Sequence, residues 1–433
     1  MKKKGVFTMS TKTLSVRAGA GRALGRAELE QLVAQHMLGA EREFCRDRMA
    51  RRVLLIPPDY TRLHSNAGII TQILYKAYNN LGVIADIMPA VGTHMQMSAE
   101  ERREMFGDIP AERFLEHDWR SDCVSVGSVP GEYAREVSEG LMSEDIPVEL
   151  DRRIADGRYA RIYSIGQVVP HEVVGMANHA KNLFVGCGGR SFIGATHLLG
   201  AVYGMERIIG RTDTPPRRLF DYAAELISGL PVTYIQTVVA TEGGEPRLKG
   251  VFLGEGREPF ELAAQLARQE NITRTGRRFA RVVAFLDPRE FRSTWVGNKA
   301  IYRTRMMIED GGELIILAPG VETFGENPET DAQIRQFGYR GRKHTLDLLG
   351  SGEDISPMTA AHLIHGSSDG RFRIVYCTEK LSEAEVRAAG FDWMPYKEAE
   401  RLYCGLEEGA NLCEDGVETW FVGAPALGLW TAE

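Results

Sequence analysis

The chain has 433 residues, of which 43% are hydrophobic and 26% are charged. This length exceeds one ordinary hydrophobic core and predicts a soluble globular protein of two domains. The formal net charge of -7 excludes the strongly basic surface of a nucleic-acid-binding protein. The 6 cysteines form no CxxC pair, so neither a zinc knuckle nor a disulfide framework is indicated.

No apolar run in the sequence is long enough to span a membrane. The start of the chain, MKKKGVFTMS, is basic but lacks the apolar segment of a signal peptide. The acidic balance also gives no reason to expect an anionic membrane surface as a partner. We therefore expect a cytoplasmic protein with neither membrane nor nucleic acid as a partner.

The first predicted elements are a helix, a strand and a second helix. Residues 26–50 have the pattern of a surface helix, polar with a few apolar positions. Residues 53–56 are wholly apolar, as expected of a strand that is buried on both faces. The loop PPDYTRLHS follows this strand, and Ser65 or Asn66 can cap the next helix.

Three polar residues, Asp59, Thr61 and Arg62, project from this strand-to-helix loop. The N-terminus of a helix attracts anions, and an arginine can bind a carboxylate or phosphate through two parallel hydrogen bonds. The loop therefore predicts an anion site. A solvated ion pair between Arg62 and Asp59 is the alternative interpretation.

A second strand-to-helix unit follows at IADIMPAVG, residues 84–92. His94 comes directly after this predicted strand and turn. Ser98 and Glu101 then have the spacing of a capping box, which predicts the start of a helix. His94 is thus expected at the carboxyl end of a strand.

The stretch from residue 161 to 211 concentrates histidines, although the whole chain has only 10 of them. Residues 161–165 read as a strand, and the proline before His171 favours an extended turn after it. Lys181 follows among glycines and apolar residues, and His197 lies on a helix predicted from Ser191 onward. A lysine in such surroundings is costly to bury without a use.

Three predicted strand ends therefore carry polar groups: the Asp59 loop, His94 and His171. If the strands are parallel, their carboxyl ends meet at one edge of a sheet, where open α/β sheets bind ligands. We interpret His179 as a structural hydrogen-bonding residue and Cys187 as a small core residue, not as ligands.

Further predicted elements follow to the end of the first domain. We expect helices over residues 217–228 and 258–269, a strand over residues 232–240 and a glycine-rich turn over residues 241–250. The polar, basic and non-periodic residues 271–278 have the character of a linker.

The second domain repeats the alternation of strands and helices. Residues 281–287, 311–320 and 371–377 are predicted strands, and residues 295–310 are a predicted helix.

The alternation predicts an α/β protein with two α/β domains and a cleft between them. The boundaries are residues 1–272 and 273–433, with the first domain larger and built on a mostly parallel sheet. Basic and amide residues on the helix of the second domain are predicted to face the first domain across the cleft, or else to be simply solvated; they are Asn298, Lys299, Arg303 and Arg305.

Together these residues resemble the nickel-pincer nucleotide dependent lactate racemase family of 2-hydroxyacid racemases and epimerases. That family has four motifs in a fixed order. They are a DxTR loop, a GTH histidine, a second histidine followed by glycine four residues on and lysine ten residues on, and a further histidine sixteen residues beyond the lysine. The corresponding residues here are Asp59-Tyr60-Thr61-Arg62, Gly92-Thr93-His94, His171 with Gly175 and Lys181 (181 − 171 = 10), and His197 (197 − 181 = 16). The resemblance spans both domains and is strongest in the first.

The resemblance implies an isomerase that inverts the C2 centre of a 2-hydroxy acid by reversible hydride transfer. The implied cofactor is the nickel-pincer nucleotide, Ni(II) pyridinium-3,5-bisthiocarboxylic acid mononucleotide, held covalently by Lys181 and made by separate maturation enzymes. His197 is the implied nickel ligand, which suits square-planar nickel with sulfur and imidazole donors. His94 and His171 are the implied acid and base on the two faces of the substrate.

The remaining implied roles divide between cofactor and substrate. Asp59, Thr61 and Gly175 are expected to bind the cofactor, and Arg62, Arg303 and Arg305 the substrate.

Two departures from the family pattern affect the expected substrate. Asn178-His179-Ala180 replaces a GGR before the lysine, where cofactor phosphate contacts are expected. The YQxxK pattern of the second domain has its counterpart in Tyr302-Arg303-Thr304-Arg305-Met306, which lacks the glutamine and the lysine. We therefore expect an acid larger than lactate, such as a sugar acid of the gluconate type.

Three alternatives remain. The protein can be a lactate racemase proper, or a zinc-dependent hydrolase that uses His94, His171 and His197 with a metal-bound water. It can also be a non-catalytic nickel or nucleotide carrier with the same fold.

Overall fold

The computed structural model describes residues 6–9, 13–46, 52–242 and 245–433. The chain forms two compact units: Met1–Thr196 with Gly210–Asn271, and His197–Ile209 with Ile272–Glu433. Both combine sheets with helices, which confirms the predicted α/β class. None of the helices in the described ranges has the length and hydropathy to cross a membrane. The end of the predicted helix 26–50, after residue 46, lies outside these ranges.

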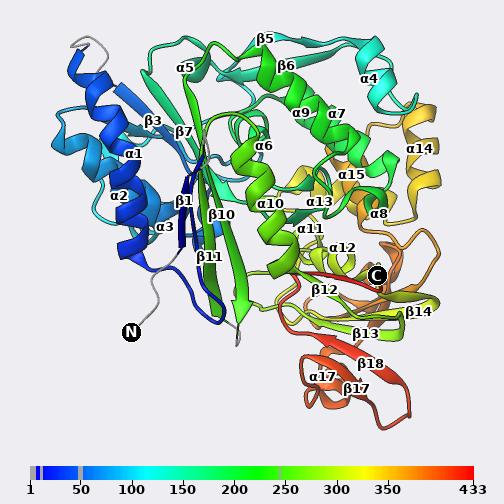
Figure 1. Ribbon diagram of the computed structural model, residues 1–433. Coiled ribbons are helices and arrows are strands. Elements are labelled where there is room, and N and C mark those ends of the chain that lie inside the picture. Colours follow the sequence, from blue (N-terminus) through cyan, green and yellow to red (C-terminus); the bar gives the residue numbers. More distant parts are fainter. Residues whose placement is uncertain (1–5, 10–12, 47–51, 243–244) are drawn as a thin grey trace. The chain divides into compact units, whose positions relative to one another are not determined.

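A seven-stranded sheet forms the centre of the first unit (Figure 1). Strands β10, β7, β3 and β4 are parallel neighbours, and β11, β2 and β1 extend the sheet with antiparallel pairing. In spatial order the strands are β1 (Val6–Met9), β2 (Thr13–Arg17), β11 (Glu245–Gly254), β10 (Val232–Glu242), β7 (Arg161–Gln167), β3 (Arg52–Ile56) and β4 (Ile84–Ile87). Two short hairpins accompany the sheet, β5 (Cys123–Val129) with β6 (Ile146–Asp151) and β8 (Pro170–His171) with β9 (Gly175–Met176).

Strand β3 sets the position of the candidate site. It is apolar after Arg52 because it is central in the sheet and buried on both faces. It pairs in parallel with both β4 and β7, so that Leu54 lies opposite Asp86 and Ile162. The loops after β3, β4 and β7 therefore leave the sheet at the same edge, as the sequence predicts.

Helices cover both faces of this sheet (Figure 1). Because side chains alternate along a strand, Val239 packs in the core with α1 and α2, while its neighbour Val238 packs with α10 on the other face. The helices of the first unit are α1 (Arg26–Arg46), η1 (Tyr60–Ser65), α2 (Ala67–Asn80), α3 (Ala99–Phe106), η2 (Ala111–Arg113), α4 (Gly131–Val137), α5 (Arg152–Ala155), α6 (Ala180–Phe184), α9 (Pro215–Leu226) and α10 (Glu258–Asn271), and α7 (Arg190–Tyr203) starts in it.

The second unit has a six-stranded sheet that is parallel except for one edge strand. In spatial order its strands are β16 (Asp392–Met394), β15 (Arg373–Cys377), β14 (Ile308–Leu317), β13 (Phe279–Phe285), β18 (Glu418–Val422) and the antiparallel β17 (Gly409–Leu412). Strands β12 (Ile272–Arg274) and β19 (Leu429–Thr431) form a separate parallel pair. The helices are α8 (Met205–Ile208), α11 (Thr294–Gly297), α12 (Lys299–Thr304), α13 (Pro328–Phe337), α14 (Arg342–Ser351), α15 (Pro357–His365), α16 (Glu383–Ala388) and α17 (Tyr396–Tyr403).

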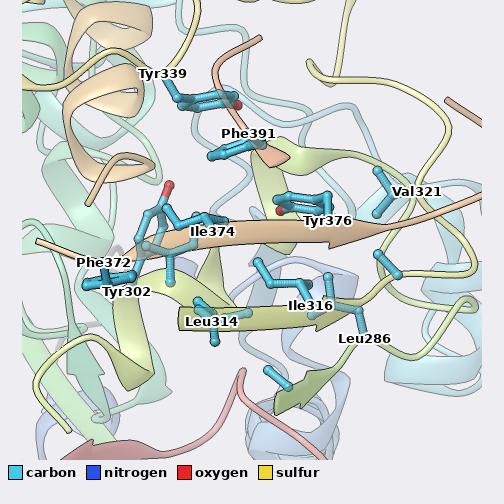
Figure 2. Close-up of a cluster of buried hydrophobic side chains, with 14 of the residues drawn as sticks. Leu286, Tyr302, Leu314, Ile316, Val321, Tyr339, Phe372, Ile374, Tyr376 and Phe391 are labelled. Carbon is cyan, nitrogen blue, oxygen red and sulfur yellow. The ribbon is translucent and has the colours of Figure 1, made fainter. Parts of the chain in front are cut away.

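Aromatic residues fill much of the core of the second unit (Figure 2). Tyr339 stacks on Phe391 with ring centroids 4.6 Å apart, and Tyr376 lies against the same ring at 4.9 Å. A buried tyrosine needs a partner for its hydroxyl group. Tyr376 donates to Oδ1 of Asn298 at 2.6 Å, which ties the junction of α11 and α12 to the sheet.

Two predicted elements are wrong. The predicted helix 295–310 is broken at Asn298 and ends by residue 304, because Ile308 already pairs with Phe279 in the sheet. The predicted turn 241–250 contains strand residues from Glu245 onward, which pair with both β10 and β2. In both cases pairing between distant segments decides the structure. The capping box of Ser98 and Glu101 is confirmed at the start of α3.

Candidate active site

Asp59 and His94 meet at the carboxyl edge of the first sheet. Asp59 caps η1 and accepts hydrogen bonds from the amide of Thr61 at 3.1 Å and from its hydroxyl at 2.5 Å. Its other oxygen, Oδ2, lies 2.5 Å from Nδ1 of His94. The loops after β3 and β4 thus bring together two residues that are 35 positions apart in the chain.

The environment of Asp59 keeps its carboxylate ionised. Burial raises its pKa, but the charge and hydrogen bond of His94, the Thr61 bonds and the charge of Arg62 outweigh burial, so the pKa lies below its ordinary value. A carboxylate can only accept a hydrogen bond, so Nδ1 of His94 carries a proton. The His94 side chain is 54% exposed, so this ring remains accessible from solvent.

Arg62 and Lys181 are cations that remain without a hydrogen-bonded partner among the described residues of this edge. In the described part of the chain, neither side chain makes a hydrogen bond or an ion pair. Arg62 and Asp59, the predicted alternative pair, form no close ion pair here, although the charge of Arg62 lowers the pKa of Asp59. Two cations that make no hydrogen bond or ion pair within the described chain can each bind a further anion.

Lys181 lies in the first turn of α6 and keeps partial solvent access, although protein atoms surround it densely. Burial lowers its pKa to about 8; Glu172 and Asp59 oppose this change, while Arg62 and Arg217 add to it. At mildly alkaline pH a substantial fraction of the amine is therefore neutral and nucleophilic.

Helix α6 is anchored on the ends of the strands. The Asn182 side chain donates to the carbonyl of Ile56 at 3.1 Å and to the hydroxyl of Ser164 at 3.1 Å. These two acceptors lie on β3 and β7, so Lys181 is placed beside the loops that carry Asp59 and His171.

The His94 loop packs on the turn that follows α6. Gly92 donates its amide to the carbonyl of Gly186 at 2.9 Å. Its φ of 56° is unfavourable for other residues, and a Cβ here would lie 3.0 Å from the carbonyl oxygen of Val185. The glycine before His94 is thus required by the close approach of the two loops.

His171 lies in the short β8–β9 hairpin, opposite Gly175. The amide of Val173 donates to Nδ1 of His171 at 3.1 Å, so in the neutral ring the proton sits on Nε2. This Nε2 lies 3.7 Å from a carboxylate oxygen of Glu172. Gly175 has a φ of 86°, and its carbonyl accepts the amide of Gly210 at 2.8 Å. Its evident role is to form the hairpin turn.

The other predicted site residues, His197, Arg303 and Arg305, belong to the second unit. His197 is half-buried on α7, and Arg303 is buried on α12. Arg305 donates from Nε to Glu206 at 2.9 Å and from Nη1 to the carbonyl of Ser367 at 3.1 Å. The Arg305 guanidinium is therefore engaged within this unit.

Sequence reasoning missed the partner of Tyr302. Its hydroxyl lies 3.0 Å from Nδ1 of His362, and Nε2 of His362 lies 2.8 Å from the hydroxyl of Tyr339. Trp295 stacks on the same imidazole with centroids 4.0 Å apart. The apolar sequence around His362, PMTAAHLIH, is typical of a core helix and contains no signal for this network.

A second cluster has metal-ligand residue types, but an arginine already occupies its carboxylates. Ligand atoms of His117, Asp122 and Asp151 lie within 4.8 Å of one another. Nη2 of Arg153 approaches the two carboxylates at 3.2 and 2.7 Å. Because the guanidinium bridges the two carboxylates, we interpret this cluster as a structural ion network.

The first unit matches a described protein family. Residues 35–207 match the family model of the lactate racemase N-terminal domain, which confirms the resemblance inferred from the motifs. All the predicted site residues except Arg303 and Arg305 lie within this segment. No curated protein matches the chain.

Two solved structures share the fold. A crystal structure of a protein from Thermotoga maritima covers 95% of this chain and 99% of its own, with a TM-score of 0.79 and 23% sequence identity. The lactate racemase apoprotein from Thermoanaerobacterium thermosaccharolyticum covers 88% of this chain and 86% of its own, with a TM-score of 0.66 and 14% identity. At these identities, the similarity establishes a common fold.

Proposed function

Because residues 35–207 belong to the lactate racemase N-terminal domain family, we propose that this protein is an isomerase that inverts the C2 centre of a 2-hydroxy acid. The observation that carries the proposal is the grouping of Arg62 and Lys181, two cations without partners in the described chain, beside the Asp59–His94 pair. Such a site offers charge for an anionic substrate and a group that can transfer a proton.

Arg62 is the proposed substrate anchor. Its guanidinium can hold a carboxylate through two parallel hydrogen bonds, and the described chain provides no internal acceptor that competes for it. A substrate fixed by its carboxylate would keep its C2 hydroxyl group near the histidines of the same sheet edge.

Lys181 fits the covalent attachment of a carboxylic-acid-derived cofactor. Its amine is unpaired in the described chain and has a pKa lowered to about 8, and both properties favour formation of an amide-type bond. In the proposed nickel-pincer nucleotide site, Lys181 would hold the cofactor, His197 would be a nickel ligand, and Asp59, Thr61 and Gly175 would line the site. When bound, this group would supply the acceptor for the C2 hydride.

His94 and His171 are the proposed proton-transfer groups. Asp59 holds a proton on Nδ1 of His94, which leaves Nε2 as the base that can take the hydroxyl proton. The Val173 amide occupies Nδ1 of His171, so proton exchange with the substrate would take place at Nε2, and the ring would act as the acid in its protonated form. Inversion requires a base on one face and an acid on the other, and the reverse reaction would exchange the roles. Asp59 would also stabilise the protonated His94 ring.

The proposed substrate is an acid larger than lactate, such as a sugar acid of the gluconate type. Support comes from α12, where Tyr302-Arg303-Thr304-Arg305-Met306 replaces the YQxxK pattern. Since Arg305 is bound to Glu206, we propose that it shapes the substrate-binding surface of its unit. We propose the same role for Arg303.

The proposal is tested on protein co-produced with the enzymes that make the cofactor. Purified protein is incubated with single enantiomers of 2-hydroxy acids, from lactate to aldonates, and the loss or change of optical rotation is followed. Intact-mass measurement with peptide mapping shows whether Lys181 carries an adduct, and metal analysis shows whether nickel is present. Zinc without an adduct would instead favour the hydrolase alternative.

Variants assign the histidines. We expect His94→Ala and His171→Ala to abolish inversion while the adduct on Lys181 remains. His344→Ala, on α14, is the control and should retain activity. Full activity in both of the first two variants would refute the assignment.

A further inference from the structure

The backbone just before Lys181 has an unusual conformation. Asn178 and His179 have φ values of 68° and 60°, a region that residues other than glycine rarely adopt. The ψ of His179 is -134°, which is still less common for a residue with a side chain. Two such residues in succession strain the backbone, so the surroundings must hold this turn in place.

The imidazole of His179 holds one side of the turn. Its Nε2 lies 3.0 Å from the carbonyl of Gly256, and its ring lies against Tyr234 with centroids 4.1 Å apart. Phe260 is the next ring, at 5.3 Å. Burial and the charge of Arg217 lower the pKa of His179 to about 3, so the ring is neutral at physiological pH. His179 stands where the family pattern GGR has a glycine, and its ring is enclosed by the contacts named above.

Arg217 holds the other side of the turn from α9. It is fully buried and donates to the carbonyl of Asn178 at 3.2 Å and to the carbonyl of Met176. Its guanidinium lies 4.5 Å from the centroid of Phe260. Within the described residues it forms no ion pair with a carboxylate, so a costly buried charge is retained to bind two backbone carbonyls.

The Asn178 side chain completes the arrangement, because it donates to Oε1 of Gln236 on β10 at 2.7 Å. The turn is thus fixed by contacts to β10, α9 and the loop before α10. Helix α6 starts at Ala180, directly after the turn, and Asn182 anchors it downstream. Lys181 lies between these two fixed points.

We propose that His179 and Arg217 are positioning residues that lock this turn and so set the orientation and reactivity of the Lys181 amine. The inference deepens the proposed function, since it concerns the residue proposed to hold the cofactor. The charged groups that act on this amine are Glu172, Arg62, Arg217 and Asp59. Loss of the turn would move Lys181 relative to all of them and toward solvent.

The test uses the full chain without cofactor, so that it does not depend on racemase activity. The protein is treated with a limiting amount of acetic anhydride at a series of pH values, and acetylation of each lysine is measured by peptide mapping. In the unmodified chain, labelling of Lys181 should have its midpoint near pH 8, as its pKa predicts. Exposed lysines in the same digest should titrate near 10.4 and serve as internal controls.

Three variants separate geometry from charge. Arg217→Lys keeps the positive charge but cannot hold both carbonyls, His179→Ala keeps a side chain without the ring, and His179→Asn suits the left-handed backbone without the ring. In each, the Lys181 midpoint should rise by about one unit or more, which lowers labelling at pH 8 by about fivefold. The control is Arg268→Lys. The Arg268 guanidinium donates to the carbonyl of Gly210 and the hydroxyl of Thr212, and not to the turn before Lys181.

The outcomes are distinct from those of the function test. A raised Lys181 midpoint in folded variants, with Arg268→Lys unchanged, supports the inference even if no 2-hydroxy acid is turned over. An unchanged midpoint and rate in folded Arg217→Lys and His179→Asn overturns it, even if the protein proves to be a racemase. Folding is checked by thermal unfolding, and His179→Asn is the variant to use if His179→Ala does not fold.

Discussion

The two units differ in whether their basic residues have partners within the protein. At the sheet edge of the first unit, Lys181 and Arg62 have no hydrogen bond or ion pair within the described chain. In the second unit, Arg305 is bound to Glu206 and to a backbone carbonyl, and Arg371 approaches the same Glu206 at 2.6 Å. Residues of similar charge therefore differ in what the fold leaves for them to bind.

This difference separates residues kept for a ligand from residues kept for structure. An enclosed charge without a partner is destabilising, and it is retained when something else depends on it. An ion pair inside one unit fixes a segment instead. Arg305 connects α12 to α8, the helix that follows the segment carrying His197. From this comparison we expect Arg62 and Lys181 to bind ligands, and Arg305 to hold helices of its unit in place.

Replacement of Lys181 should have the largest effect. Lys181→Met is expected to lose the covalent adduct and all inversion, and yet to raise the free energy of unfolding, because an unpaired amine no longer has to be desolvated. Lys249→Met is the control: Lys249 is buried and pairs with Glu242 and the carbonyl of Arg22, so its loss should destabilise. Intact mass and urea unfolding measure the two effects. Equal destabilisation by both changes would show that Lys181, like Lys249, contributes to the stability of the fold.

Replacement of Asp59 should reduce catalysis without loss of the fold. Asp59→Asn no longer fixes the proton on Nδ1 of His94, and kcat should fall by about 10²- to 10⁴-fold. The adduct on Lys181 should remain. Asp213→Asn, which removes an exposed carboxylate that pairs with Arg218, is the control and should stay close to the parent activity. If Asp59→Asn retains its kcat, Asp59 does not act on His94 in the reaction.

Acid should destabilise the first unit through His179. Its pKa in the folded protein is lowered to about 3, so below pH 6.5 the unfolded chain binds the extra proton and the folded chain does not. The stability is complete above pH 6.5 and is lost as the pH falls toward 3. At pH 5 the loss should be about 2 kcal/mol, and His179→Asn should lack this part of the pH dependence. Urea titrations at pH 7, 6 and 5 provide the measurement.

The ion pair of Arg305 and Glu206 should have the smallest effect. Glu206 remains partly exposed, so Arg305→Met, Glu206→Gln and the double variant should show a coupling energy of about 1 kcal/mol or less in unfolding. We expect a small loss of stability and a modest rise in KM, because Arg305 is proposed to shape the substrate-binding surface without holding the substrate. A large rise in KM without any loss of stability would indicate that Arg305 binds the substrate directly, as Arg62 is proposed to do.

Local patterns in the sequence predicted much of the first unit. The apolar run of β3, the capping box at Ser98 and the proline before His171 are short-range signals, and the structure has the corresponding elements. The errors at residues 245–250 and 306–310 arise where strands form by pairing with distant segments. Hydrogen bonding across a sheet depends on the partner strand, which a local pattern does not contain.

The amino-acid sequence by itself determined which chemical groups the protein carries and at which strand ends they stand, because strand ends and helix starts follow from local polarity and capping. Only the tertiary structure decided the partners: His94 with Asp59, Arg305 with Glu206, and Arg217 with the backbone before Lys181. These contacts join segments 35, 99 and 39 residues apart. Whether a charge is paired or left for a ligand depends on such contacts, since burial and partners exist only in the folded chain.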